Sequence, residues 1–295
     1  MRRIKLIGVA SGWGARDRRC EDGPDSLLAA GPLSCLASDG HAPPSYEILR
    51  AVPPPTGWDA IAAVVQINQR LADAVRQCVS ADEFPIVIGG DHSCAVGTWS
   101  GVQGAVAERG ALGLLWVDAH MDSHVPQTSP SGALHGMPLA CLLGHGLDEL
   151  THLAGPSPKL NPAHVCLLGV RSFEAGEAEL LAALGVRVIY MDEVARRGFM
   201  TMWREAMAHV TRATAGYGIT LDLDALDPRD APGVGTPSPA GIDADELVQA
   251  LAEARHDRRW LALEIAEYNP HLDHEQMTLR LLRRIVCAVG AGASG

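Results

Sequence analysis

Residues 111–124 read Ala-Leu-Gly-Leu-Leu-Trp-Val-Asp-Ala-His-Met-Asp-Ser-His, an apolar run that ends in a cluster of polar side chains. The first seven residues are typical of a buried strand. If the chain stays extended beyond that run, alternate residues share one face, so Asp118, His120, Asp122 and also His124 would point the same way. Carboxylates on one face cost desolvation and mutual repulsion, which a bound cation would offset. For this stretch alone, a polar surface turn is the competing interpretation.

Two other polar clusters also follow apolar runs directly. They are Gly89-Gly90-Asp91-His92-Ser93 and Asp222-Leu223-Asp224-Ala225-Leu226-Asp227-Pro228. Ligands of α/β proteins bind where the carboxyl ends of parallel strands meet, so all three clusters fall where a shared site is expected. Together the clusters predict a metal site.

Composition places the chain among soluble globular proteins. It has 295 residues, of which 47% are hydrophobic and 20% charged, and its net charge of -11 suits a cation-binding enzyme better than a nucleic-acid surface. Seven scattered cysteines without a C-x-x-C pair predict reduced thiols and a cytoplasmic location. Cys94 is expected to be a small buried residue at the start of a helix. The first apolar run contains Lys5 and is too short for a signal peptide, and no run approaches the ~18 residues of a membrane span.

Strands and helices are expected to alternate along the chain. The expected strands are residues 4–9, 84–88, 111–117, 164–170, 186–190, 219–223 and 260–265. The expected helices are residues 25–30, 58–79, 94–109, 137–144, 177–184, 199–213, 279–289 and one that Asp243 caps and that runs to about residue 256. The proline-rich segment 42–55 is expected to be an extended connector. This alternation predicts the α/β class, with a mostly parallel sheet between helix layers and one domain over residues 1–295.

Other site motifs do not fit the chain. The aspartate cluster fails as an EF-hand because Leu226 occupies its fifth position and no glycine follows. Gly233-Val234-Gly235 lacks the preceding strand and the third glycine of a dinucleotide-binding turn, and neither a phosphate-binding loop nor a G-x-S-x-G motif occurs. A hydrolytic metal site is the interpretation that is left.

The ordered motifs carry a resemblance to a known family. GGDHS (89–93), DAHMD (118–122), SGALHG (131–136), LDLDALDP (221–228) and Glu-Tyr-Asn-Pro (267–270) resemble the signature motifs of the arginase (ureohydrolase) family, and the match covers nearly the whole chain. The resemblance implies a three-layer α/β/α domain around a central, mainly parallel eight-stranded sheet. It also implies a homo-oligomer, either a trimer or a hexamer.

The same resemblance implies two metal ions per chain. It assigns one ion to His92, Asp118, Asp122 and Asp222, and the other to Asp118, His120, Asp222 and Asp224. Asp118 and Asp222 would bridge the ions. Four carboxylates and two imidazoles form a hard, oxygen-rich set that favours Mn²⁺, with other divalent ions as alternatives.

The implied reaction is hydrolysis of the guanidinium group of arginine or a close analogue, which releases urea (or hydroxyurea). A hydroxide that bridges the metals would be the nucleophile. The resemblance gives Asp122 the role of passing the proton of the hydroxide to the leaving amine. It makes His135 a proton shuttle and pairs Glu267 with the substrate guanidinium.

Specificity is where the sequence departs from the family pattern. Ser131 stands where arginases bind the substrate α-carboxylate, and Thr236 is also assigned to substrate binding. His124 and Ala133, however, stand where arginases usually carry asparagines, and Glu174 replaces an aspartate that reads the α-amino group. An amino-acid guanidine is the first expectation. Agmatine, another guanidino acid and formimidoylglutamate are the alternatives within the family.

Two other classes of protein fit the sequence less well. A homologue that binds metal without catalysis would have broken ligands, whereas all six residues are present. A single-zinc deacetylase on a related fold needs only one Asp-His-Asp set, so the second set, including His92 and Asp122, argues against it. The expected partner is thus a small guanidino substrate, not a nucleic acid or a membrane.

Overall fold

The computed structural model describes residues 3–31, 36, 44–51 and 59–290. The strands are β1 (Ile4–Ala10), β2 (Ser45–Arg50), β3 (Phe84–Gly89), β4 (Leu112–Val117), β5 (Val165–Val170), β6 (Arg187–Tyr190), β7 (Gly216–Asp222) and β8 (Trp260–Ala266). The α-helices are α1 (Gly23–Ala29), α3 (Ala60–Ser80), α4 (Ala95–Val106), α5 (Pro138–Leu142), α6 (Asp148–Thr151), α7 (Ala175–Leu184), α8 (Met191–Arg197), α9 (Phe199–Val210), α10 (Ala244–Ala254) and α11 (Met277–Gly290).

The strands form one sheet of eight, in the order β2-β1-β3-β8-β7-β4-β5-β6. Every neighbouring pair is parallel. The predicted α/β class with a central eight-stranded sheet is therefore confirmed, and the sheet is wholly rather than mostly parallel. Because all strands run the same way, their carboxyl ends lie along a single edge of the sheet.

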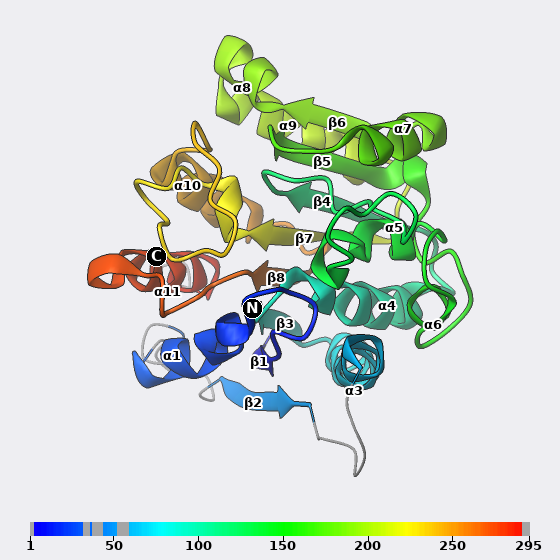
Figure 1. Cartoon of the computed structure of the whole chain (residues 1–295), viewed down its shortest axis with the longest axis horizontal. Coiled ribbons are helices and arrows are strands. Elements are labelled where there is room, and N and C mark those ends of the chain that lie inside the picture. The colour runs from blue at the N-terminus through cyan, green and yellow to red at the C-terminus, as the bar shows by residue number, and fades with distance from the viewer. Residues whose placement is uncertain (1–2, 32–35, 37–43, 52–58, 291–295) are drawn as a thin grey trace.

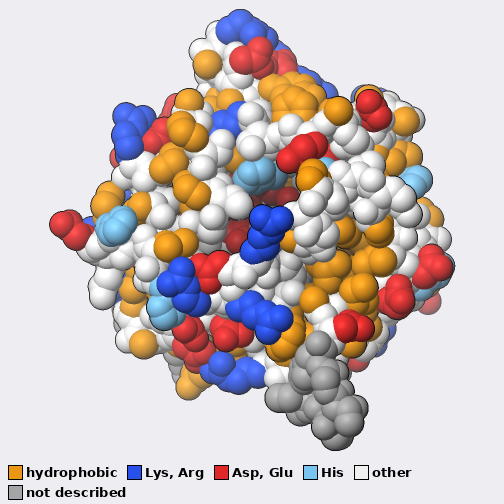
Figure 2. Space-filling view, in the orientation of Figure 1, with side chains coloured by type: hydrophobic (Ala, Val, Ile, Leu, Met, Phe, Trp, Pro, Cys, Tyr) orange, Lys and Arg blue, Asp and Glu red, His pale blue; other side chains and the backbone are white. Residues whose placement is uncertain are grey.

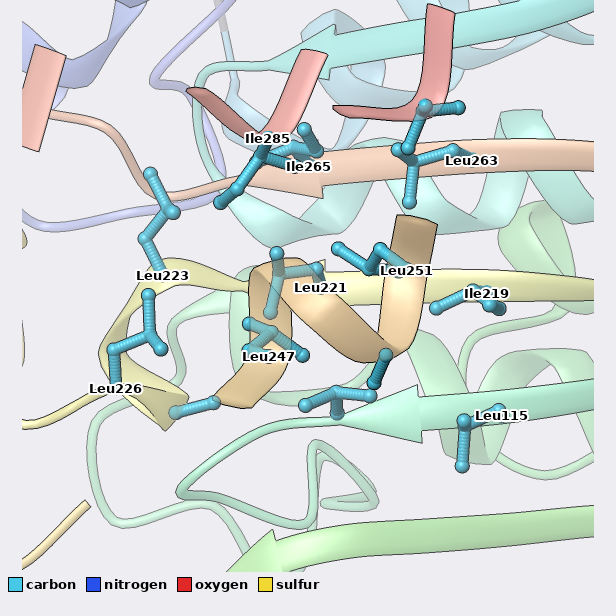
Figure 3. Packing of buried hydrophobic residues seen from close by; sticks show 14 of the residues in the cluster. Leu115, Ile219, Leu221, Leu223, Leu226, Leu247, Leu251, Leu263, Ile265 and Ile285 are labelled. Atoms are coloured by element: carbon cyan, nitrogen blue, oxygen red, sulfur yellow. The ribbon is translucent and has the colours of Figure 1, made fainter. Parts of the chain in front are cut away.

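Helices cover both faces of the sheet, which gives three layers (Figure 1). Strand β4 shows how one strand serves both faces, because Leu115 and Val117 pack in one hydrophobic cluster and Leu114 and Trp116 in another. The first cluster also holds residues of α1, α9, α10 and α11, and the second holds residues of α3, α4, α5 and α7. Figure 3 shows side chains of the first cluster, where α10 packs against β7. The sheet buried on both faces explains the apolar runs in the sequence.

The prediction for residues 42–55 is wrong at its centre, where Ser45–Arg50 form the edge strand β2 and pair with β1. Residues 42–43 and 52–55 lie outside the described residues, as does residue 58, the expected start of α3. The short helices α6 and α8 were not expected. Asp243 caps α10 as predicted, because its carboxylate accepts hydrogen bonds from the backbone N–H groups of Asp245 and Glu246.

Among the described residues, the cysteines follow the prediction except at one position, and Cys35 lies outside those residues. Cys94 is buried directly before α4, and Cys20, Cys78, Cys141 and Cys166 are also buried and free. Cys287 in α11 is disulfide-bonded, so the prediction of reduced thiols is wrong for this residue. Over the described ranges, no helix is long and apolar enough to span a membrane.

Candidate metal centre

The residues predicted to bind metal lie at the ends of three of the four central strands. His92 follows β3, Asp118 and His120 follow β4, and Asp222 ends β7. Strand β8 lies between β3 and β7 and is followed by Glu267. The parallel order of these strands thus brings together segments that are up to 175 residues apart in the chain.

Four of these side chains form a buried group that could hold an ion: His92, Asp118, Asp122 and Asp222, called here the His92 group. Nδ1 of His92 lies 2.9 Å from Oδ2 of Asp122, 3.1 Å from Oδ2 of Asp222 and 3.4 Å from Oδ2 of Asp118. The imidazole stacks on Trp116, with ring centroids 4.6 Å apart. One nitrogen therefore faces three carboxylates.

A second group, the His120 group, consists of Asp118, His120 and Asp224. Nδ1 of His120 lies 3.1 Å from Oδ2 of Asp224 and 3.5 Å from Oδ1 of Asp118. Asp118 belongs to both groups, as a bridging ligand would. Asp222, the other predicted bridge, lies only in the His92 group.

Hydrogen bonds within local turns orient these carboxylates. Oδ1 of Asp118 accepts a hydrogen bond from the backbone N–H of His120 at 2.7 Å. Oδ1 of Asp222 accepts one from the backbone N–H of Asp224 at 2.9 Å. The backbone of Asp122 has φ of +48°, so the chain bends after β4 instead of remaining extended. The expected shared face is therefore not formed by an extended strand, although Asp118, His120 and Asp122 do converge.

The donor set fits a pair of cations. Nδ1 of His92, Oδ2 of Asp122 and Oδ1 of Asp224 are buried without a hydrogen-bond partner. Burial and the charge of Asp118 raise the pKa of Asp122 to about 6 in the metal-free protein, and burial and Asp224 raise the pKa of Asp222. Burial opposes ionisation of His92, but its three carboxylate neighbours raise its pKa above the ordinary value. Buried carboxylates that resist ionisation together, and ligand atoms without a partner in hydrogen-bond geometry, are groups that divalent ions would stabilise.

Glu267 and His135 lie beside the His92 group. Oε1 of Glu267 accepts a hydrogen bond from the backbone N–H of His92 at 2.8 Å and lies 3.0 Å from Nδ1 of His135. Burial lowers the pKa of His135, but Glu267 outweighs that effect and raises it to about 9. Glu267 has φ of +70°, a left-handed conformation that ends β8 and turns this carboxylate inward.

His124 lies in a separate group, the outer cluster, with Glu174 and Glu177. Its Nε2 lies 3.0 Å from Oε2 of Glu174 and 3.4 Å from Oε2 of Glu177, and its Nδ1 lies 3.1 Å from Oγ1 of Thr128. Burial raises the pKa of Glu177 to about 8. Glu177 was not among the predicted site residues, and its carboxylate also accepts hydrogen bonds from the backbone N–H groups of Ser123 and Glu174.

A cavity of about 220 Å³ joins the metal groups to the outer cluster. Its wall includes most of the predicted site, namely His120, Asp122, His124, Ser131, His135, Glu174, Asp222, Asp224 and Thr236. Oγ1 of Thr236 donates to Oδ2 of Asp224 at 2.9 Å. Ala133 follows Ser131 on the same loop, and its backbone N–H donates to Oγ of Ser131. Figure 2 shows acidic and histidine side chains together in a hollow near the middle of this face.

Arg171 is a site residue whose role the sequence did not reveal. Its Nη2 donates to the carbonyl oxygens of Asp224 and Ser238, both at 2.7 Å, and its Nε donates to that of Pro239 at 3.0 Å. Its Nη1 donates to the carbonyl of Ala225 at 3.1 Å. One guanidinium thus ties the loop that carries Asp224 to the loop that follows Thr236. In the sequence, the sign of this role was that Arg171 directly follows a predicted strand.

Two buried polar residues behind His92 were also missed. Oγ1 of Thr220 lies 3.0 Å from Nε2 of His92, and it donates to Oε1 of Glu264 at 2.7 Å. Both residues are fully buried. A glutamate within the apolar run 260–266 was a visible sign of a buried polar contact.

Comparisons with known proteins agree with this geometry. The family model described as Arginase family matches residues 2–291. The chain is 37% identical to an arginase of Brevibacillus brevis, over 97% of each chain, and 38% identical to an arginase of Bacillus caldovelox, over 94% of each. It superposes on the crystal structure of arginase from Bacillus subtilis with a TM-score of 0.89 and 34% identity, over 100% of both chains. The fold, the two groups of residues that could hold metal ions and these matches lead to one conclusion: the chain belongs to the arginase family.

Proposed function

We propose that this protein hydrolyses the guanidinium group of arginine or a close analogue and releases urea, using two divalent ions per chain. The observation that carries the proposal is the pair of ligand groups that share Asp118 and that contribute His120, Asp122, Asp222 and Asp224 to the wall of one cavity. The arginases named above support the substrate class. We place the whole activity in one domain, residues 1–295.

Two bound divalent ions would lower the pKa of a water molecule between them and supply the nucleophile that a resonance-stabilised guanidinium requires. Mn²⁺ is the proposed ion because the ligands are carboxylates and imidazoles without a thiolate. His92, Asp118, Asp122 and Asp222 would hold one ion. Asp118, His120, Asp222 and Asp224 would hold the other, which requires Asp222 to serve both.

The chain's own residues would bind the substrate and move protons. Glu267 is proposed to pair with the guanidinium, because its buried carboxylate lies beside the His92 group. Asp122 lies on the cavity wall, and its raised pKa suits a carboxyl group that takes up a proton and passes it to the leaving amine. His135 also lines the cavity, its side chain is 22% exposed, and it is proposed to exchange protons with solvent.

The outer part of the cavity is proposed to bind the amino-acid end of the substrate. Ser131 and Thr236 each offer a hydroxyl group, and Glu174 offers a carboxylate for an α-amino group. His124 is proposed as a donor to the substrate carboxylate, in place of the usual asparagine. Ala133 offers no such donor, which leaves other guanidino compounds as alternatives to arginine.

We further propose a cytoplasmic homo-oligomer, a trimer or a hexamer. The five free buried cysteines support a reducing compartment. The disulfide of Cys287 is the feature that speaks against it.

A urea-release assay with Mn²⁺ across arginine, hydroxyarginine, agmatine and guanidinobutyrate tests the proposed function. Arginine or hydroxyarginine is expected to give the highest kcat/KM, and the metal-free protein is expected to be inactive. Because hydroxyarginine would release hydroxyurea, its assay must also follow ornithine. A Mn²⁺-loaded protein that turns over none of these compounds would refute the proposal.

A further inference from the structure

We propose that the outer cluster is a binding site for a third divalent ion, separate from the proposed ion pair. Its ligands would be Nε2 of His124 and one carboxylate oxygen each of Glu174 and Glu177, and these three atoms lie within 4.8 Å of one another. One imidazole with two carboxylates suits a transition-metal ion such as Zn²⁺ better than Mg²⁺ or Ca²⁺, which take oxygen ligands. The inference goes beyond the proposed function, because it requires neither the ion pair nor a guanidino substrate.

A single imidazole nitrogen faces two carboxylates in the outer cluster. Nε2 of His124 lies 3.0 Å from Oε2 of Glu174 and 3.4 Å from Oε2 of Glu177. The His92 group has the same kind of arrangement, because Nδ1 of His92 faces three carboxylates there. In the metal-free protein, protons held between such groups must offset the repulsion of their lone pairs. A divalent ion bound to the same atoms would replace those protons.

Other contacts hold the two buried ligands in place. His124 is 7% exposed and Glu177 is 3% exposed. Nδ1 of His124 lies 3.1 Å from Oγ1 of Thr128, on the side of the ring away from the carboxylates. Oε1 of Glu177 accepts a hydrogen bond from the backbone N–H of Ser123 at 3.2 Å, and its Oε2 accepts one from that of Glu174 at 3.0 Å. Metal ligands in proteins are commonly oriented by outer contacts of this kind.

The third ligand, Glu174, lies where an ion could enter. Its side chain is 58% exposed, and all three residues of the outer cluster line the cavity of about 220 Å³. An ion could therefore reach the site from solvent without any rearrangement of the buried ligands. Three protein ligands leave at least one coordination position of Zn²⁺ open, which water in the cavity would fill.

The charges of the outer cluster also favour a cation. Among the described residues, His124 is the sole basic side chain that pairs with either glutamate. Burial, together with the charge of Asp122, raises the pKa of Glu177 to about 8, so this carboxyl group holds a proton that an ion would displace. Hydrogen bonds with Glu177 and His124 lower the pKa of Glu174, which keeps that ligand ionised.

His124→Asn and Glu177→Gln test the site, with Glu179→Gln as the matched control. Glutamine in place of Glu177 can still accept the backbone hydrogen bonds but has no charge, and Glu179 is an exposed carboxylate on the same helix, α7. Calorimetric titration of the full-length, metal-free protein with Zn²⁺ is expected to show three ions per chain in the wild type and in Glu179→Gln. In the other two variants one ion should bind at least about tenfold more weakly, because losing a ligand costs more than losing an outer contact.

Asp118→Ala separates the third ion from the ion pair. This variant is expected to lose the pair, so the ion of the outer cluster should be the one that remains. Mass spectrometry of Asp118→Ala under native conditions should then find a single Zn²⁺ per chain. Adding His124→Asn to this variant should remove that ion, whereas adding Glu179→Gln should leave it bound.

Two results would overturn the inference. One is a folded wild type that binds no more than two Zn²⁺ in excess of the ion. The other is a third ion that His124→Asn and Glu177→Gln both retain at unchanged affinity, which would make it an adventitious ion only. The unfolding temperature of each metal-free variant shows whether it is folded. Since no substrate is used, a protein without guanidine hydrolysis would refute the proposed function and leave this test valid.

Discussion

Nδ1 of His135 lies 3.0 Å from Oε1 of Glu267, so two residues with different proposed roles pair with each other in the absence of substrate. A guanidinium that binds Glu267 must share or replace this contact. His135 would then be released toward the cavity, where it could take part in proton transfer. The pair thus links the arrival of the substrate to the position of the proposed proton shuttle.

Glu267→Gln is expected to lose most turnover and to retain both metal ions. The amide cannot balance the charge of a guanidinium, and loss of a charge-assisted hydrogen bond costs about 1.5–3 kcal/mol. That cost corresponds to a decrease in kcat/KM of about tenfold to about 150-fold. Steady-state kinetics and metal analysis of the same preparation measure both effects. Turnover close to that of the wild type would remove Glu267 from substrate binding.

The His135–Glu267 pair is also expected to make the stability of the metal-free protein depend on pH. Because folding raises the pKa of His135 from 6.5 to about 9, its contribution is complete below pH 6.5 and is lost as the pH rises through 9. The contribution is on the order of 3 kcal/mol at most. Urea unfolding of wild type and His135→Asn should therefore give curves that differ at pH 6 and approach each other by pH 10. A difference that does not change with pH would contradict the assignment.

Asp118→Ala and Asp222→Ala are expected to abolish activity and binding of the metal pair together. Asp118 belongs to both ligand groups, and Asp222 is proposed to do so once ions are bound. Atomic absorption or mass spectrometry of the purified variants gives the number of ions per chain. If either variant still bound two ions, that residue would not be a bridging ligand.

His124→Ala is expected to raise KM for arginine about tenfold or more while kcat changes less, which is the behaviour of lost uniform binding. Ala133→Asn, which restores the usual amide, should lower KM for arginine. Agmatine has no carboxylate, so neither substitution should change its KM by this route. Equal effects on both substrates would mean that His124 does not bind a carboxylate and serves instead to hold Glu174.

Most of the metal centre could be predicted because its residues follow apolar strands, and parallel strands end at one edge. The predictions failed where long-range packing decides the outcome. Strand β2 forms by pairing with β1, and its six residues within a proline-rich segment did not indicate that pairing. The bend at Asp122 separates His124 from the metal ligands, although alternation in the sequence placed them together.

The residues behind the ligands were harder to predict for a related reason. Thr220 lies within a run that reads as an ordinary buried strand, and its hydroxyl meets its two partners, Glu264 on the neighbouring strand and the imidazole of His92, only in the folded chain. Arg171 likewise contacts backbone carbonyls, which carry no side-chain pattern in the sequence. Local patterns therefore identified the groups that would contact ions, and not the groups that hold them in place.

The hydrogen bonds of Arg171 have a consequence for redesign of the cavity. They tie the segment around Ser238 and Pro239 to the carbonyl of Asp224, so a change of loop length there would shift a metal ligand. In the loop before His135, by contrast, Ser129 is partly exposed and Ser131 is exposed, and their hydroxyls bond only within that loop. Variant libraries designed to let the cavity accept bulkier guanidines should accordingly vary residues 129–133 and leave residues 236–239 unchanged.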